Sequence, residues 1–391
     1  MKAARFIAKK LKPKGGIAIV CIAISFLVMI VSVAISSGFR QEIQSALSDI
    51  SGDVQILPAD LDLVNESSPI EREPSYMSNL QGLRGVKEIR PVVYRAGMVK
   101  HKDKIHGVMI KGVEGLAERY DSLSLPVEIP SKLSRILELE PGDRMLTYFV
   151  SDDIKVRTFK VASEYNAILE SDDKLIVYAD LKDMQRLNKW TQDEVSAFEV
   201  ILDPDLQNAD DIARMSSEIG FITAAYSADD EASVVTQSSV RMFPQLFDWL
   251  NLIDFNVLFI LGLMTLVAGF NMISGLLIML FENISTIGLL KSLGMRDKEI
   301  AKTFLLSSSS LILKGMVIGN AVALAFCVIQ KYTHVLKLDP ANYFVGHVPV
   351  SINLSSILVA DFVAYFIIML LLLIPSVFIS RVDPAQTVRV R

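Results

Sequence analysis

Histidine, cysteine and carboxylate side chains are the first candidates for chemistry in this chain of 391 residues. The four histidines show no spacing typical of a metal site; they are His101, His106, His334 and His347. Cys21 and Cys327 each lie in an apolar stretch, where a thiol usually serves as a small buried side chain. No phosphate-binding G-x-x-x-x-G-K-[ST] motif is present. We therefore predict a chain that is not an enzyme and holds no catalytic residue, metal or cofactor.

Polar residues inside apolar stretches are the second set of candidates. Asn271 and Lys314 each lie ten residues from the same end of neighbouring stretches, roughly 15 Å deep at 1.5 Å per residue. A charge in a membrane span is costly and normally faces protein or water, so we expect these two to hydrogen-bond across the spans. Asp361 lies closer to the opposite end. A structural hydrogen bond is expected there, with a proton relay as the alternative.

Four apolar stretches must position these residues in a chain that is 51% hydrophobic. They cover residues 16–37, 252–280, 304–329 and 354–379, and each exceeds or approaches the ~20 residues that a membrane helix needs. The first is too long for the ~7–15-residue core of a signal peptide. Within 304–329, Gly315 and Gly319 form a G-x-x-x-G pattern, which lets two helix backbones approach closely.

The predicted fold is an α-helical membrane protein with a large α+β extracytoplasmic domain between its first two helices. The four transmembrane helices are placed at 15–37, 251–281, 304–329 and 354–379. The other segments are a cytoplasmic amphipathic segment at 1–14, the domain at 38–250, a cytoplasmic loop at 282–303, an outer loop at 330–353 and a cytoplasmic tail at 380–391. For 1–14, an interfacial helix and a plain cationic topology signal remain equal alternatives.

Orientation follows from lysine and arginine in the short flanks of the spans. The first fourteen residues hold six of them and no acid, and the 282–303 loop holds four, against two in the 330–353 loop. Both termini and the 282–303 loop are therefore predicted to be cytoplasmic. The domain at 38–250 has 37 acidic against 23 basic residues, which argues against nucleic acid as a partner.

The domain at 38–250 has no cysteine, so no disulfide can hold it together. Short alternating segments predict strands, at 53–57, 88–101, 104–113, 143–150, 155–166, 174–181 and 197–202. Helices are predicted at 180–188 and at 208–220, the second ending at Gly220. From 232 to 245 the pattern again indicates a helix, which leads into the second span. The first two spans are expected to continue outward as stalks.

The stretch "FENISTIGLLKSLGMRDKEIAKTF" at 281–304 is more elaborate than a connector requires. A helix from Asn283 places Ile287, Leu289, Leu290 and Leu293 on one arc, and Gly294 lies where a helix stop is expected. A second helix begins near Arg296. A cytoplasmic helix with an apolar stripe fits a groove in a partner; resting on lipid is the alternative.

The same stretch resembles the coupling-helix segment of MacB/FtsX-type ABC transporter permeases. The resemblance extends along the chain and is nearest to the lipoprotein-releasing LolC/LolE permeases. It includes "ISSGFRQEIQ" (35–44), "LDPANYFVGHVPVSIN" (338–353) and "SRVDPAQTVRVR" (380–391). "FVSDDIKVRTF" (149–159) departs from the LolC pattern because it lacks the proline of the hook that grips the carrier, which favours a LolE-like or homodimeric subunit.

The resemblance implies a bacterial inner-membrane subunit that releases lipoproteins. The implied partners are a LolD-like ATPase dimer that binds ATP and Mg, a second permease subunit, the lipoprotein, and a LolA-like periplasmic carrier. The residues implied to contact the ATPase are Glu282, Ile287, Gly288, Leu289, Leu290, Lys291, Leu293 and Gly294. A MacB-type efflux permease, an FtsX-like regulator of a periplasmic partner and a tethered adhesion or sensor domain are the alternatives.

We further hypothesise that acyl chains bind between spans one and two of opposite subunits. Methionine adapts to varied apolar shapes, and aromatic and aliphatic side chains accompany it in both spans. The residues expected to line this groove are Phe26, Met29, Phe259, Leu263 and Met264.

Overall fold

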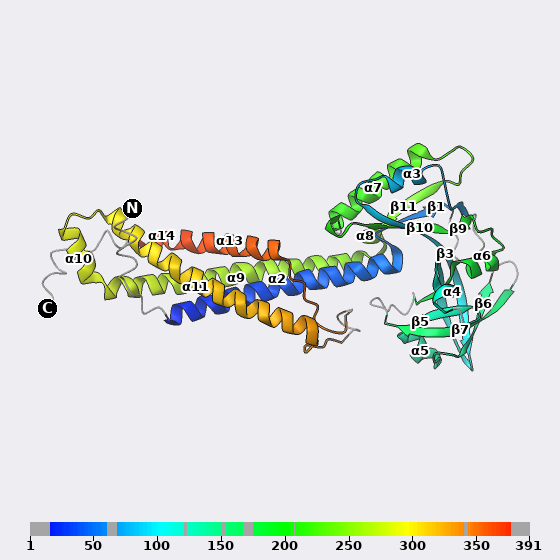
Figure 1. Cartoon of the computed structure of the whole chain (residues 1–391), viewed down its shortest axis with the longest axis horizontal. Coiled ribbons are helices and arrows are strands. Elements are labelled where there is room, and N and C mark those ends of the chain that lie inside the picture. Colours follow the sequence, from blue (N-terminus) through cyan, green and yellow to red (C-terminus); the bar gives the residue numbers. More distant parts are fainter. Residues whose placement is uncertain are drawn as a thin grey trace. The chain divides into compact units, whose positions relative to one another are not determined.

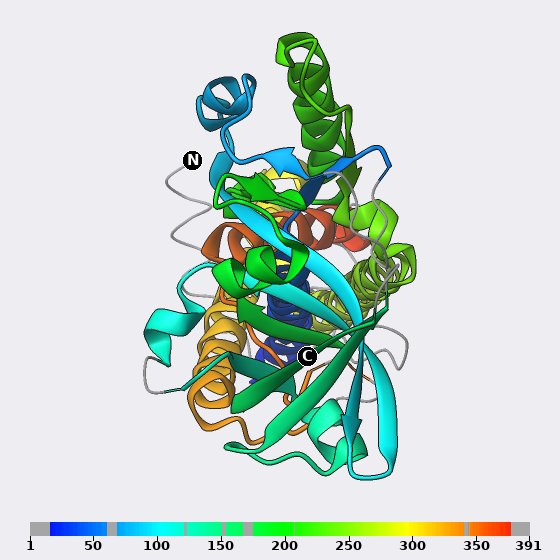
Figure 2. The same ribbon diagram turned by 90° about the vertical axis from the view of Figure 1, so that its right-hand side faces the viewer.

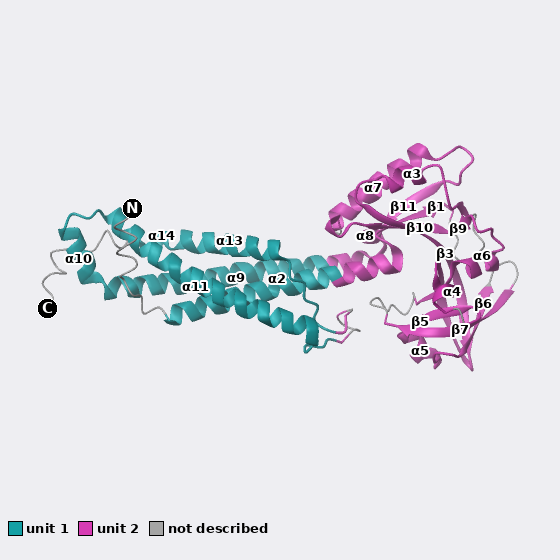
Figure 3. Cartoon of the chain, viewed as in Figure 1, with its two compact units in different colours: residues 1–41, 249–338, 347–391 teal, residues 42–248, 339–346 magenta. Residues whose placement is uncertain are grey.

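The computed structural model describes residues 16–60, 69–120, 123–150, 154–166, 175–206, 208–339, 343 and 345–376. The chain divides into two compact units, which Figure 3 shows in different colours. We call residues 1–41, 249–338 and 347–391 the membrane unit, and residues 42–248 and 339–346 the sheet unit. The predicted segments 1–14 and 380–391 lie outside the described residues.

The membrane unit is built from long apolar helices (Figure 1). In the part of the chain that the structure describes, four helices are long and apolar enough to cross a membrane. They are α2 (Gly16–Ser51), α9 (Pro244–Glu282), α11 (Asp297–Thr333) and α13 (Leu354–Leu371), which α14 (Leu373–Ser376) extends. The first three have 36, 39 and 37 residues. About 20 residues suffice to span a bilayer. All three helices are longer than this and continue beyond the predicted spans.

The G-x-x-x-G pattern of α11 packs directly on α2. A β-carbon built on Gly315 would lie 2.7 Å from Ile22 Cγ2, and one on Gly319 would lie 2.5 Å from the carbonyl oxygen of Ala23. Only glycine therefore permits this approach, and the close helix contact expected from the pattern is confirmed. An apolar core surrounds the crossing; its buried members include Ile22, Phe26, Met272, Leu276, Phe304, Ile312 and Ile368.

The sheet unit is organised by one long strand, β3 (Val86–His101). Its first half pairs with β10 (Ala197–Leu202) and its second half with β4 (Lys104–Val113). β3 also pairs with β6 at Met98–Lys100. This last pairing closes β3, β4, β8, β5, β7 and β6 into a ring of strands, while β11, β1 and β10 extend the sheet from the other half of β3. Figure 2 shows the long β3–β4 hairpin in cyan.

The remaining strands confirm most of the predicted positions. They are β1 (Val54–Pro58), β2 (Ile70–Glu71), β5 (Pro126–Pro130), β6 (Arg144–Val150), β7 (Ile154–Tyr165), β8 (Ile176–Asp180), β9 (Glu194–Val195) and β11 (Val234–Ser238). The helices of the unit are α3 (Met77–Gln81), α4 (Leu116–Arg119), α5 (Ser131–Leu137), α6 (Leu181–Asn188), α7 (Ala209–Tyr226) and α8 (Ser239–Met242). β2, β5, β9 and β11 were not predicted, and residues 151–153 between β6 and β7 lie outside the described part.

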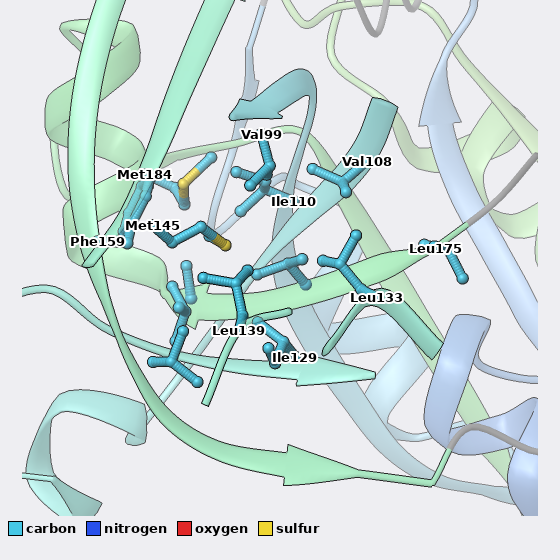
Figure 4. Close-up of a cluster of buried hydrophobic side chains, with 14 of the residues drawn as sticks. Val99, Val108, Ile110, Ile129, Leu133, Leu139, Met145, Phe159, Leu175 and Met184 are labelled. Atoms are coloured by element: carbon cyan, nitrogen blue, oxygen red, sulfur yellow. The ribbon is translucent and has the colours of Figure 1, made fainter. Parts of the chain in front are cut away.

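The ring of strands encloses an apolar core (Figure 4). Alternate residues of β3, β4, β6 and β7 point inward, as the period of two in a strand requires. They meet side chains from α5 and α6. The buried members include Val99, Val108, Ile110, Ile129, Leu133, Met145, Phe149, Phe159, Val177 and Met184.

Two predictions for the sheet unit are wrong. Gly220 does not stop α7, which continues to Tyr226. A β-carbon on Gly220 would lie 2.7 Å from Thr236 Oγ1, so this glycine serves close packing between α7 and β11. Residues 232–245 are not one helix, because Val234–Ser238 form β11 and pair with all of β1. The β-branched valines favour a strand once β1 offers an open edge.

Candidate functional site

The loop between α9 and α11 folds into a short helix, α10 (Ile284–Ser292). Asn283 separates it from α9, and its side-chain amide donates to Met279 O at 2.8 Å. Gly294 has φ +84°, which gives the predicted helix stop the left-handed backbone it needs. Met295 N then donates to Leu290 O at 3.0 Å. The turn is therefore closed by its own backbone before α11 begins at Asp297.

One side of α10 is packed into the core of the membrane unit. Ile287 is fully buried, and Leu290 packs against the same cluster together with Met295. Their neighbours include Ile300 and Phe304 at the start of α11. α10 is consequently braced against the membrane helices and forms part of their core.

The opposite side of α10 is a separate exposed stripe. It consists of Ser285, Thr286, Leu289, Ser292 and Leu293, with Leu289 58% and Leu293 75% exposed. The single apolar arc predicted for Ile287, Leu289, Leu290 and Leu293 is thus divided between two surfaces. At 3.6 residues per turn these four positions spread over roughly 160°, wide enough for Ile287 and Leu290 to face the core while the other two face outward.

A further side of α10 carries Gly288 and Lys291. Gly288 is buried, and the Lys291 side chain is only 10% exposed because its Nζ pairs with Asp297 Oδ1 at 3.0 Å. This ion pair joins α10 to the first turn of α11, where acidic residues favour the helix dipole. Glu282, one of the residues implied to contact the ATPase, is the exposed last residue of α9.

The residues predicted to line an acyl groove do not share one surface. Phe26 and Met29 are buried in the core of their own chain, and a β-carbon on Gly319 would come within 3.0 Å of Phe26 Cβ. Phe259 and Leu263 are 65% and 46% exposed on α9, and Met264 is half-buried. Within one chain, only the α9 residues are open to a ligand or a partner.

Polar side chains inside the membrane helices form interhelical contacts whose partners the sequence did not indicate. Asn320 Nδ2 of α11 donates to Asp361 Oδ2 of α13 at 2.5 Å. The hydroxyls of Ser309 and Tyr365, on the same two helices, lie 2.7 Å apart. Asp361 therefore has the structural hydrogen bond that was expected, with Asn320 as its partner.

Asn271 and Lys314 are not joined in the described part of the chain. Asn271 on α9 is half-buried, Lys314 on α11 is exposed, and no hydrogen bond links them there. Lys314 lies on a side of α11 that points away from the core of its own chain. Gly315, the next residue, faces α2.

A polar cluster joins α2 to α9 near residue 40. Asp254 accepts a hydrogen bond from Ser36 Oγ at 2.7 Å and forms an ion pair with Arg40. The rings of Phe39 and Trp249 meet edge to face, with centroids 5.7 Å apart. Ser36 and Arg40 are four residues apart and share one helix face. Sequence reading missed this cluster, although an arginine and an aspartate close to the ends of two apolar stretches were its signal.

The described residues hold no group of three or more His, Cys, Asp and Glu side chains that could bind a metal ion. The site consists of a short helix that packs on the membrane helices and carries an exposed stripe, and of four long helices joined by close packing and polar contacts. These features suit a mechanical role. The class of protein that this arrangement defines is a multi-helix membrane protein with a large domain between its first two long helices.

Comparison with known proteins identifies one domain of the chain. Residues 258–384 match the FtsX-like permease C-terminal family. The chain is 22% identical over 396 residues to the lipoprotein-releasing system transmembrane protein LolE of Haemophilus influenzae, covering 93% of this chain and 91% of LolE. The chain therefore carries an FtsX-like permease domain and is weakly similar to LolE over most of its length.

Solved structures of domains from related transporters are also similar to this chain. The extracellular domain of the noncanonic ABC-type transporter YknZ from Gram-positive bacteria has 13% identity and a TM-score of 0.29, covering 47% of this chain and 99% of that domain. The periplasmic region of MacB from Actinobacillus actinomycetemcomitans has 11% identity and a TM-score of 0.32, covering 51% and 95%.

Proposed function

We propose that this chain is the permease subunit of an inner-membrane ABC transporter that extracts lipoproteins from the outer leaflet. A separate LolD-like ATPase dimer binds ATP and Mg and supplies the driving reaction. A second permease subunit, identical or related, completes the transporter, and a LolA-like carrier accepts the product. The similarity to LolE over most of the chain supports the choice of lipoprotein as substrate.

The observation that carries the proposal is the form of α10. A helix that is buried on one side and exposes two leucines among hydroxyl side chains on the other transmits force only if something binds its exposed side. Leu289 and Leu293 are the two large apolar side chains of that side. The lysines and the arginine of the 282–303 loop favour the cytoplasmic face, where an ATPase is available.

The energetics of the substrate require a driving reaction. Each acyl CH₂ group buried in the bilayer contributes about 0.8 kcal/mol to membrane binding, so a lipoprotein with several chains does not leave unaided at a useful rate. In this proposal, α10 moves with the ATPase and takes the helices of the membrane unit with it. Phe259 and Leu263 remain our candidates for acyl contact, since they are exposed on α9.

The test uses the full chain purified with its ATPase and reconstituted with a lipoprotein. Burial of a leucine side chain contributes about 1.5–3 kcal/mol. Leu289→Asp or Leu293→Asp should therefore weaken the affinity for the ATPase at least about tenfold, and less ATPase should co-purify. Lipoprotein-stimulated ATP hydrolysis should fall with it. The matched control is Leu336→Asp, which makes the same change at a leucine 43% exposed in the 330–353 loop.

Two results would contradict the proposal. If Leu289→Asp and Leu293→Asp bind the ATPase as the unmodified chain does, α10 is not the coupling element and rests on lipid. If binding is lost as expected but the unmodified transporter hydrolyses ATP without releasing lipoprotein, the permease assignment stands and the substrate is wrong.

A further inference from the structure

The last turn of α2 is held on the sheet by one buried lysine. Lys111, on β4, is 2% exposed, and its Nζ donates to two carbonyl oxygens at the end of the helix, Asp49 O at 3.2 Å and Ile50 O at 2.9 Å. The last carbonyls of a helix have no partner within the helix and carry its negative dipole end. The ammonium group therefore satisfies two of them and neutralises their partial charge.

The same ammonium group forms a buried ion pair with β10. Its Nζ lies 2.7 Å from Glu199 Oε1, and Glu199 is fully buried. Glu199 also accepts a hydrogen bond from the Tyr94 hydroxyl, which in turn accepts one from Gln55 Nε2 at 2.9 Å. One network thus joins the end of α2 to β4, β10, β3 and β1.

The connection from α2 to β1 is short and tightly packed. Gly52 has φ +68°, and a β-carbon there would lie 2.9 Å from Glu199 Cβ. Asp53 follows at once: its carboxylate accepts from Ser48 Oγ of α2 and from Leu202 N of β10, and its carbonyl oxygen accepts from Ser239 N of α8. α2 therefore enters β1 through a two-residue connection that is fixed on all sides.

A buried ion pair is weak evidence for stability, because desolvation offsets much of the attraction, and an apolar pair of similar volume often serves as well. What distinguishes this pair from an apolar one is that its hydrogen bonds are directional. The three N–H groups of Lys111 meet oxygens of Asp49, Ile50 and Glu199, and together these contacts define one geometry. The core that surrounds Val99 and Phe159 is largely apolar, with Arg95 buried beside the Phe149 ring. The Lys111–Glu199 pair lies where the helix that begins in the membrane unit ends on the sheet.

We propose that Lys111 and Glu199 are positioning residues that lock the end of α2 rigidly onto β4 and β10, so that a displacement of α2 moves the sheet unit with it. This inference rests on the proposed function, in which the ATPase drives the membrane helices. It assigns the transmission of that movement to one buried ion pair. Loosening the pair should leave ATP hydrolysis intact and uncouple it from lipoprotein release.

The experiment uses the full-length transporter and the variant Lys111→Met/Glu199→Gln, which removes both charges and nearly preserves volume. Lys111→Met/Glu199→Met is a second, wholly apolar variant in case the first does not fold. The matched control makes the same changes in an exposed ion pair of the same unit, Lys104→Met/Glu138→Gln, whose side chains are 48% and 57% exposed at 3.0 Å.

Two readouts are taken. The first is lipoprotein released per ATP hydrolysed, which we expect to fall roughly 5- to 150-fold, the usual range for coupling between sites. The second is the distance distribution between spin labels at Gln41 on α2 and Phe221 on α7, both exposed. Cys21 and Cys327 are replaced by alanine beforehand. The distribution should broaden in the ion-pair variants and keep its width in the control.

Each outcome decides between the hypotheses. A folded ion-pair variant whose distribution keeps its width overturns the rigid linkage, whatever its release rate. A broadened distribution with release per ATP unchanged overturns the role of the linkage in transport. If the unmodified transporter releases no lipoprotein, the proposed function fails, while the label distances still decide whether Lys111 and Glu199 fix the helix.

Discussion

Replacing Gly319 by alanine should separate α2 from α11. The added β-carbon would lie 2.5 Å from the carbonyl oxygen of Ala23 and 3.0 Å from Phe26 Cβ, where ordinary contact is 3.4–4 Å. The nearest obstacle is backbone, so no rotamer change relieves it, and the two helices must move apart by roughly 1 Å to restore van der Waals contact. Such overpacking typically costs about 1–3 kcal/mol.

The substitution also has a favourable component that needs its own control. Alanine is better than glycine in a helix by up to about 1 kcal/mol. Gly262 on α9 has nothing within 4 Å of an added β-carbon, so Gly262→Ala reports this component alone. Gly319→Ala should therefore be less stable than Gly262→Ala by about 1–3 kcal/mol, or roughly 2–12 °C in the midpoint of unfolding for a unit of this size.

A thiol-reactive fluorogenic maleimide can follow this unfolding in detergent. Cys327 on α11 is fully buried, and the sheet unit contains no cysteine, so in a Cys21→Ala background the signal reports the membrane unit alone. If Gly319→Ala and Gly262→Ala raise the midpoint equally, α11 does not pack on α2 through its glycines, and the account of this helix crossing is wrong.

Two further predictions concern the sheet unit. Burial raises the pKa of Glu199, and Lys111 opposes that rise. In Lys111→Met the folded state should therefore favour the neutral carboxyl of Glu199. The stability that the neutral carboxyl contributes is complete below the unfolded pKa of ~4.3 and is lost as pH rises through the folded pKa. The unfolding midpoint should thus fall from pH 5 to pH 8 in Lys111→Met but not in Lys111→Met/Glu199→Gln, and equal slopes would contradict this. Gly220→Ala should lower the midpoint because its β-carbon would meet Thr236 Oγ1 at 2.7 Å, and Thr236→Ala should restore it; an additive loss in the double variant would exclude the contact.

Much of the sheet unit could be read from the sequence because its strands alternate. The segment 104–113 was predicted with the bounds of β4, and 197–202 with those of β10. Each contains a charged residue among apolar neighbours, Lys111 in the first and Glu199 in the second. Neither segment shows that the two charges meet, because they are separated by 88 positions and are joined only by the order of the strands.

The α10 stretch shows where pattern reading stops. Its helix, its glycine stop and the second helix after it follow from local rules. Which of its four apolar side chains faces a partner does not, because an arc of roughly 160° can be divided between two surfaces. The division depends on Ile300 and Phe304 of α11, which complete the core around Ile287. The same limit applies to Phe26 and Met29, since an apolar residue in a span faces lipid or protein according to its neighbours.

The contacts of α2 with α11, α9 and the sheet differ in chemistry because their surroundings differ. Within the apolar part, Gly315 and Gly319 bring α11 close, because lipid offers no hydrophobic force to hold two helices together and close packing must do so. Further along, where water can reach, Arg40 and Asp254 are 25% and 40% exposed, and such a pair is worth no more than about 1 kcal/mol. Only at its last turn does α2 meet a fully buried charge pair, whose value lies in fixing one geometry. In the proposed transmission, the contact with α9 yields during a transport cycle while the attachment to the sheet holds, and the movement of α2 then reaches the sheet.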